Sequence, residues 1–301
     1  MTLAEAPTLW ELVQLAPEPL LAGAALALMC SVLSVLVVVK RLGFIGQGIS
    51  HSAFGGVGVS AMLAALGVIS TGGAAEFGIV LGFCVLTALG MIAAEGQRKT
   101  SVDAAIGLFL VASMAVGGLL SHAAQRVAPQ FGQPADSRSW ESILFGSIIV
   151  TDRRDVVIGW VACIVVVGML WWWRRAVTFW AFDEHTARAF GVPTGAVKSL
   201  VMILLAVAVV TAMKLAGVVL ATALLVLPGA TALRLSDKLG RTLALAVGVG
   251  TTGVLGGLCA SLLFDLQPGP CMVLVMTGMF VGAAVIGWLR GRRGANSTMA
   301  A

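Results

Sequence analysis

The stretch that decides the fold class is residues 199–233, SLVMILLAVAVVTAMKLAGVVLATALLVLPGATAL, in which Lys214 is the only charged residue. A helix that crosses the roughly 30 Å of hydrocarbon in a bilayer needs about 20 mostly apolar residues. The stretch therefore predicts two membrane-spanning helices that meet at Lys214. Because the segment before Lys214 is short, one broken helix is the alternative.

Apolar blocks of this kind recur along the whole chain. Of its 301 residues, 59% are hydrophobic and 11% are charged, whereas soluble globular proteins carry about 25% charged residues. This composition excludes a soluble enzyme, a disordered chain and a disulfide scaffold, and it predicts an all-α polytopic membrane protein. We expect about nine spans, or eight if the stretch above is one broken helix, from the blocks without Asp, Glu, Lys or Arg: 19–39, 42–75, 77–94, 104–125, 156–173, 199–213, 215–233, 242–264 and 266–289.

The distribution of basic residues predicts the orientation. Cytoplasmic loops of membrane proteins are enriched in Lys and Arg. If the C-terminus with Arg290, Arg292 and Arg293 is cytoplasmic, alternation through nine spans places the N-terminus outside and most of the 19 basic residues inside. This excess accounts for the net charge of +5 without a nucleic-acid partner. Because no domain-sized soluble segment interrupts the spans, we expect residues 1–301 to form a single transmembrane domain without its own ATPase.

A cluster of polar side chains near the start of the second block is the first candidate site. The segment 43–60, GFIGQGISHSAFGGVGVS, places Gln47 and His51 on the same helix face, with Ser50 beside them. Polar side chains within a span are costly unless they face the protein interior or a pathway, and neutral imidazole is a common metal ligand. Gln47, Ser50 and His51 are therefore candidates for a metal pathway. The alternative is that they hydrogen-bond a neighbouring helix.

A short capped helix is expected in the connection 180–194, WAFDEHTARAFGVPT. Asp183 is a good N-cap, and Gly191 followed by Pro193 is a good stop signal. The helix at about 183–191 carries charged and aromatic side chains and suits docking into a cleft of another protein. The alternative is an ordinary connector between two spans.

A proline and a glycine near the inner end of the seventh block predict a helix break at Pro228 and Gly229. Proline removes a backbone hydrogen bond, and such breaks are common where irregular backbone lines a pathway. None of the nine blocks contains a carboxylate, and no nucleophile–base arrangement or catalytic motif is present, so an enzyme is not expected.

Several separated segments give the chain a family resemblance. It resembles the membrane-permease subunits of ABC importers for zinc, manganese and iron. The segments that carry the resemblance follow one another in the expected order between about residues 40 and 290: GFIGQGISHSAFGGV at 43–57, SVDAAIGLFL at 101–110, FDEHTARAFGVP at 182–193, KLAGVVLATALLVLPGATALRL at 214–235 and FDLQPGPCMVLV at 264–275.

The resemblance implies a type II importer-like permease in a bacterial-type cytoplasmic membrane. It implies a dimer with a second permease chain, two ABC ATPase subunits docked on cytoplasmic coupling helices, and an extracytoplasmic metal-binding protein that delivers the ion. The transported divalent metal would be substrate, with no permanently bound cofactor. Members of the family commonly carry Asp at the position of Gln47, whereas His51 matches. The residues expected to couple to the ATPase are Asp183, Glu184, Ala187, Arg188 and Gly191.

Two other classes of transporter are the alternatives to a metal permease. A siderophore- or cobalamin-type ABC permease shares the coupling-helix and proline-span pattern, but it needs a wide pathway. An ion-coupled secondary transporter needs a titratable residue in the membrane, for which His51 and His122 are the candidates. The sequence names neither the metal nor the choice between a homodimer and a heterodimer.

Overall fold

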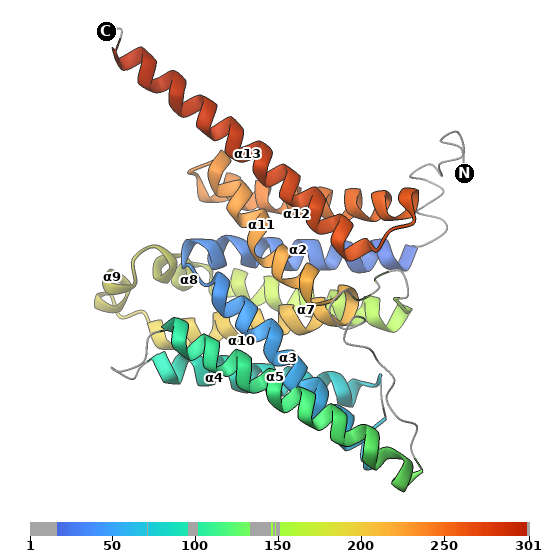
Figure 1. The fold of residues 1–301 in the computed structure, drawn as a ribbon. Coiled ribbons are helices and arrows are strands. Elements are labelled where there is room, and N and C mark those ends of the chain that lie inside the picture. The colour runs from blue at the N-terminus through green and yellow to red at the C-terminus, as the bar shows by residue number, and fades with distance from the viewer. Residues whose placement is uncertain are drawn as a thin grey trace.

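The computed structural model describes residues 17–70, 72–95, 102–132, 146, 148 and 151–299, and within them every regular element is a helix. Figure 1 shows the helices running roughly side by side. Their bounds are α2 (Pro17–Val39), α3 (Gly43–Ala65), α4 (Ala74–Glu95), α5 (Val102–Val127), the 3-10 helix η2 (Ala128–Phe131), α7 (Arg153–Trp172), α8 (Arg174–Phe182), α9 (Glu184–Ala189), α10 (Thr194–Ala216), α11 (Val218–Leu235), α12 (Leu239–Phe264) and α13 (Pro268–Met299).

The expected spans are present as helices. Eight helices of the described chain are long and apolar enough to cross a membrane: α2, α4, α5, α7, α10, α11, α12 and α13. The remaining long helix, α3, has 23 residues, but its glycines and polar side chains make it less apolar. It coincides with the second charge-free block, and most of its side chains are buried against other helices.

The junction between α10 and α11 is a turn between two separate helices. Gly217 has φ +87° and ψ +163°, a conformation essentially restricted to glycine. α10 extends beyond its charge-free block at both ends, and the Lys214 Nζ atom near its end lies 2.8 Å from the Asp155 Oδ1 atom of α7. Because α10 and α11 pack against each other, the alternative of one broken helix is wrong.

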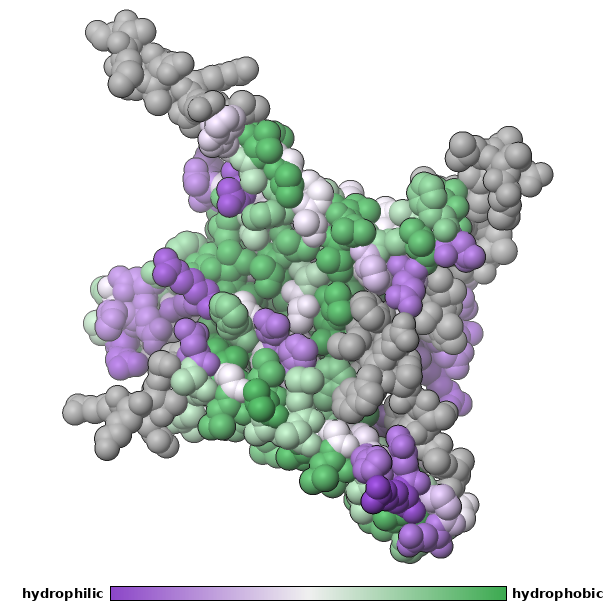
Figure 2. Space-filling model, in the orientation of Figure 1, coloured by the Kyte–Doolittle hydropathy of each residue, from purple (hydrophilic) through white to green (hydrophobic). Residues whose placement is uncertain are grey.

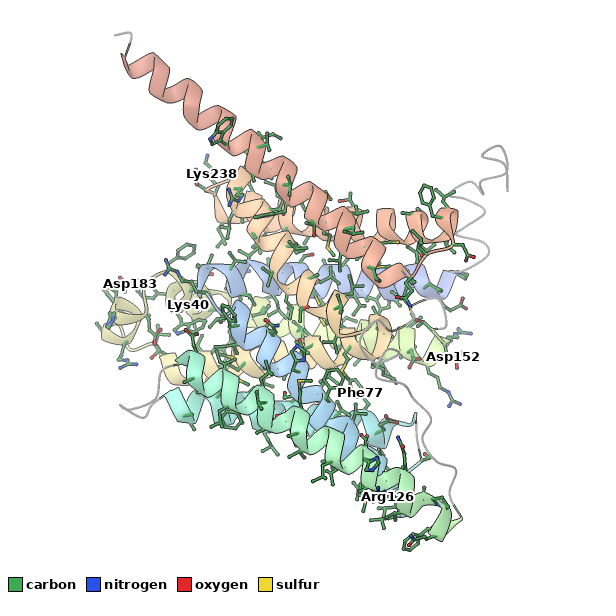
Figure 3. All side chains as sticks on the ribbon, viewed as in Figure 1. Lys40, Phe77, Arg126, Asp152, Asp183 and Lys238 are labelled. Carbon is green, nitrogen blue, oxygen red and sulfur yellow. The ribbon has the colours of Figure 1, made fainter. Side chains whose placement is uncertain are left out.

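The ends of the spans separate into two groups. Figure 3 places Lys40, Asp183 and Lys238 at one end of the bundle and Arg126 and Asp152 at the other. Figure 2 shows mostly hydrophobic residues over the middle of the visible face, with hydrophilic residues gathered at its ends. This distribution is that of a multi-pass membrane protein, in which apolar side chains face lipid and charged residues remain near water.

α3 is held by close backbone contacts with its neighbours. A Cβ atom added at Gly58 would lie 2.5 Å from the Gly117 carbonyl oxygen of α5, and one added at Gly56 would lie 2.8 Å from the Val80 Cα atom of α4. Glycines at such positions let helices approach within backbone contact, as small residues do in membrane bundles. α3 also contacts α10 and α11, and to a smaller extent η2 and α2, so most of its surface is packed within the bundle.

Candidate functional site

The polar residues of α3 occupy two different faces of the helix. Gln47 is exposed, His51 is partly exposed, and Phe44 on the same stripe is 70% exposed. Ser50 instead is fully buried, and its hydroxyl donates a hydrogen bond of 2.9 Å to the Gly46 carbonyl oxygen. The exposed stripe of α3 therefore consists of Phe44, Gln47 and His51. The placement of Ser50 beside Gln47 and His51 is wrong, because neighbouring helices cover the face of α3 that carries Ser50.

The imidazole of His51 has an unsatisfied nitrogen. Its ring stacks on that of Phe54 with the centroids 5.9 Å apart and an interplanar angle of 23°. The His51 Nδ1 atom is buried and has no hydrogen-bond partner within the described chain. Because buried polar atoms are almost always paired, an unpaired one calls for an explanation. In the part of the chain that the structure describes, no hydrogen bond joins Gln47 or His51 to another helix, so the packing alternative gains no support.

A metal site is not complete within one copy of the described chain. No group of three or more His, Cys, Asp or Glu side chains that could hold a metal ion occurs among the described residues. The α3 stripe offers one imidazole and one amide, both of which are neutral donors. Any site built on this stripe therefore needs donors from elsewhere.

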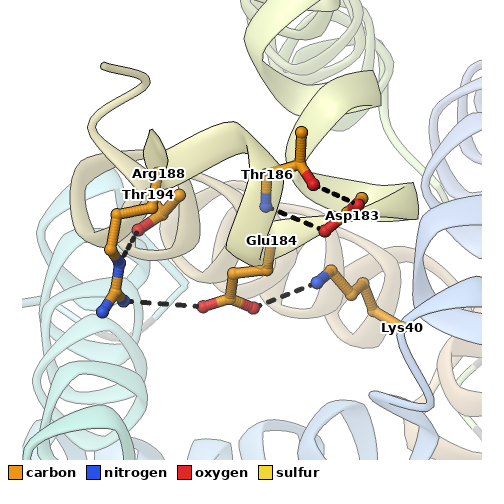
Figure 4. Close-up of polar contacts among 6 residues, drawn as sticks. All are labelled: Lys40, Asp183, Glu184, Thr186, Arg188 and Thr194. Carbon is orange, nitrogen blue, oxygen red and sulfur yellow. Dashed lines mark hydrogen bonds and ion pairs between the residues drawn. The ribbon is translucent and has the colours of Figure 1, made fainter. Parts of the chain in front are cut away.

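The short helix expected between two spans is present as α9, and Asp183 caps its start. The Asp183 carboxylate accepts hydrogen bonds from the Thr186 hydroxyl at 2.5 Å and from the Thr186 backbone N–H at 2.9 Å (Figure 4). These two bonds, the hydroxyl first, hold the pKa of Asp183 below its usual range. The carboxylate therefore stays charged and keeps the first turn of this six-residue helix closed.

Gly191 closes the other end of α9. It has φ +80°, and its N–H donates to the Arg188 carbonyl oxygen at 3.1 Å, while the Val192 N–H donates to the Ala187 carbonyl oxygen at 3.0 Å. This pair of bonds is the Schellman arrangement, which requires a left-handed residue at the position of Gly191. Ala187 is fully buried, so the helix rests on its neighbours through this small side chain.

Glu184 connects α9 to the turn between α2 and α3. Its Oε2 atom lies 3.1 Å from the Lys40 Nζ atom, and its Oε1 atom lies 4.0 Å from the Arg188 Nη2 atom (Figure 4). The Lys40 ammonium also lies 4.3 Å from the ring centroid of Trp180, which is buried. Lys40 thus links α9 to the segment that leads directly into α3.

The sequence prediction missed the role of Lys40. A single lysine after a span is an ordinary interfacial residue, and nothing in the sequence joins it to Glu184 across 144 positions. Of the residues expected to contact an ATPase, Asp183, Glu184 and Arg188 all form bonds within the chain. The Arg188 Nε–H donates to the Thr194 hydroxyl at 3.4 Å, yet the Arg188 side chain remains 74% exposed. Phe190, next to Gly191, is 77% exposed.

The predicted helix break at Pro228 and Gly229 is wrong. α11 continues through Pro228 to Leu235. Proline is tolerated inside membrane helices because neighbouring groups satisfy the freed backbone. Gly229 serves close packing instead, since an added Cβ atom would collide with the Ser34 carbonyl group of α2.

The chain is similar over most of its length to metal-transport membrane proteins. Residues 13–287 match a family model described as the ABC 3 transport family. The manganese transport system membrane protein MntC of Halalkalibacterium halodurans is 28% identical over 268 residues, which are 87% of this chain and 84% of that protein. The high-affinity zinc uptake system membrane protein ZnuB of Haemophilus influenzae is 23% identical over 262 residues, which are 87% of this chain and 94% of that protein.

A solved structure has the same fold. The structure described as PsaBC from Streptococcus pneumoniae in complex with Fab superposes with a TM-score of 0.73 and 25% sequence identity, covering 89% of this chain and 90% of that one. The family match extends over far more than half of the sequence. The chain therefore belongs to the ABC 3 transport family of metal-uptake membrane permeases, as its motifs predicted.

Proposed function

We propose that this permease carries a divalent transition metal ion, of the manganese, zinc and iron class, into the cytoplasm along the exposed stripe of α3. The observation that carries the proposal is the His51 imidazole, which is partly exposed on the stripe and whose Nδ1 atom has no hydrogen-bond partner among the described residues. An unpaired polar group in a membrane is costly, so a role in binding accounts for its presence.

Two copies of the chain complete the site. If the α3 stripes of two permeases face each other across an axis, two imidazoles and two Gln47 amides converge. Neutral donors compensate the charge of a dehydrated divalent ion less than carboxylates do. The site is therefore weak, which suits transport because an ion that is held tightly does not leave. The second copy is an identical chain or a different permease.

The partner subunits act at opposite ends of the bundle. The end with α9 is cytoplasmic, the N-terminus lies outside, and an ATPase docks on each α9 through exposed side chains such as Arg188 and Phe190. A metal-binding protein delivers the ion at the outer end. ATP binding and hydrolysis move α9, and the ion pair between Glu184 and Lys40 carries this motion to α3, so that the pathway opens alternately to each side.

The test is metal uptake by the reconstituted transporter in proteoliposomes. His51→Ala is expected to abolish ATP-dependent uptake of radioactive manganese or zinc because it removes the only nitrogen ligand of the stripe. Ser50→Ala is the matched control: it changes the next residue on a buried face, and uptake is expected to continue. Gln47→Asp is expected to strengthen metal binding and to slow release. Unchanged uptake in His51→Ala would show that the metal pathway does not run along this stripe.

The same assay separates the alternative classes of transporter. A siderophore- or cobalamin-type permease would move the chelate and not the free ion, and an ion-coupled transporter would work without ATP. Free-ion uptake that requires ATP is the expected result.

A further inference from the structure

A groove of about 900 Å³ lies at the α9 end of the bundle, away from the α3 stripe. Its walls come from four helices, α2, α7, α8 and α12, and they are almost entirely apolar. The deepest residue on α2 is Val32, seven residues before the last residue of the helix, which corresponds to about 10 Å along its axis. The groove therefore covers most of one leaflet, whose hydrocarbon is about 15 Å thick.

The mouth of the groove carries a different chemistry. Among the described residues, the polar ones that line it are Arg174, Arg175 and the hydroxyl-bearing Thr178, and none is a carboxylate. The Arg174 guanidinium lies 4.4 Å from the ring centroid of Trp171, a stacking contact that holds it at the helix end and leaves its N–H groups free to donate. Within the described chain, no carboxylate forms an ion pair with Arg174 or Arg175.

Trp171 and Trp172 place this mouth at the level of the headgroups. They are 69% and 84% exposed at the end of α7. Tryptophans are enriched at the boundary between hydrocarbon and water. The groove thus has an apolar body at the depth of acyl chains and two guanidinium groups at the depth of phosphates.

We propose that this groove binds an anionic phospholipid, with an acyl chain between α2, α7 and α12 and its phosphate at Arg174 and Arg175. Guanidinium groups bind phosphate oxygens in a bidentate geometry. A zwitterionic lipid fits less well because its amine would lie close to the same two positive charges. A second copy of the chain also fits poorly, since a symmetric contact would bring the arginine pairs of both copies together.

The position of the groove gives the lipid a consequence for transport. α8 forms one wall and leads directly through Asp183 into α9. A lipid wedged between α8, α2 and α12 holds α8 in one position relative to the spans, and therefore also α9. This effect on activity depends on the proposed coupling role of α9, whereas the binding itself does not.

The binding test uses the purified permease in nanodiscs that contain phosphatidylglycerol or phosphatidylcholine with identical photoreactive acyl chains. Phosphatidylglycerol is expected to crosslink to α2, α7 or α12 and phosphatidylcholine to do so much less. The double variant Arg174→Gln, Arg175→Gln should weaken phosphatidylglycerol crosslinking about 10- to 30-fold, from the contribution of two basic side chains near an anionic headgroup. Arg234→Gln, at the same end but on α11, is the matched control and should crosslink as the wild type does.

A second variant tests the apolar part of the groove. Leu36→Trp fills it from α2 and should abolish crosslinking of both lipids there, while size-exclusion chromatography shows that the oligomeric state is unchanged. Equal crosslinking of the two lipids, or an unchanged preference in the double arginine variant, would overturn the proposal. Loss of the dimer in Leu36→Trp would indicate that a second copy of the chain occupies the groove, and this result would also overturn the lipid proposal. If crosslinking follows the expectation but ATP hydrolysis is insensitive to phosphatidylglycerol, the proposed effect of the lipid on α9 fails and the lipid site stands.

Discussion

Reversing the charge of Lys40 should uncouple ATP hydrolysis from the pathway. The Lys40 side chain is 16% exposed and its partner Glu184 is 40% exposed, so water screens this pair only in part. Loss of the ion pair costs about 0.5–1 kcal/mol for a partly exposed pair, and loss of the cation–π contact with Trp180 costs about 0.5–1 kcal/mol more. Lys40→Met should therefore weaken the attachment of α9 to the α2–α3 turn by about 1–2 kcal/mol.

Lys40→Glu adds repulsion to this loss. Two carboxylates about 4 Å apart repel each other by about 1–4 kcal/mol, depending on the local dielectric. The total, about 2–6 kcal/mol, lowers the population in which α9 is attached by about 30-fold or more, because each 1.4 kcal/mol is a factor of ten. The expected result is basal ATP hydrolysis that metal no longer stimulates, with little change in the thermal unfolding temperature of the spans.

The assay is metal-stimulated ATP hydrolysis by the complete transporter in proteoliposomes. Lys40→Arg should retain most of the stimulation, and Lys238→Glu, an equal charge change at the same end of the bundle, is the matched control. The swapped pair Lys40→Glu, Glu184→Lys should recover part of it, limited by the proximity of the new lysine to Arg188. Full stimulation in Lys40→Glu, or no recovery in the swapped pair, would refute the role of this ion pair.

The remaining predictions concern the two ends of α9 and the packing of α11. Gly191→Val should reduce metal-stimulated ATP hydrolysis, whereas Gly191→Asn should largely retain it. A side chain at this position meets open space, but the left-handed backbone costs most residues about 1–2 kcal/mol. Equal activities of the two variants would contradict this prediction. Gly229→Val should lower the unfolding temperature and the yield of inserted protein because its side chain collides with the Ser34 carbonyl group, whereas Gly282→Val, in open space, should not. Because the pKa of Asp183 is lowered, the stability that its cap provides is present above the ordinary carboxyl pKa and is lost only as pH falls through the lowered value. Wild type and Asp183→Asn should therefore show the same pH profile of ATP hydrolysis between about pH 5 and 8, and a difference confined to that range would contradict the assignment.

The positions of the spans could be predicted because membrane solvation is a local constraint. Each block without charges became one helix, and the caps of α9 are likewise set by neighbours such as Asp183, Thr186 and Gly191. Features that depend on distant partners could not be predicted. Whether Ser50 faces a pathway depends on which helices cover it, and the pairing of Lys40 with Glu184 depends on how two connections meet.

The prediction of a helix break at Pro228 failed for a different reason. Its missing N–H is a real local defect, and in an isolated helix it would favour a kink. In the bundle, α11 runs on through it because the contacts of Gly229 and its neighbours with α2 hold the helix in place. The sequence shows the defect, but only the packing determines whether the helix ends there.

The backbone contacts of α3 determine how motion can travel through this protein. Because α3 touches α4 at Gly56 and α5 at Gly58 through the backbone, no side chain at these two points can absorb a relative movement of the helices. The 23 residues of α3 make a lever about 35 Å long. A rotation of ~5° about the Lys40 end would displace the far end of α3 by about 3 Å and His51, eight residues from the start of the helix, by about 1 Å.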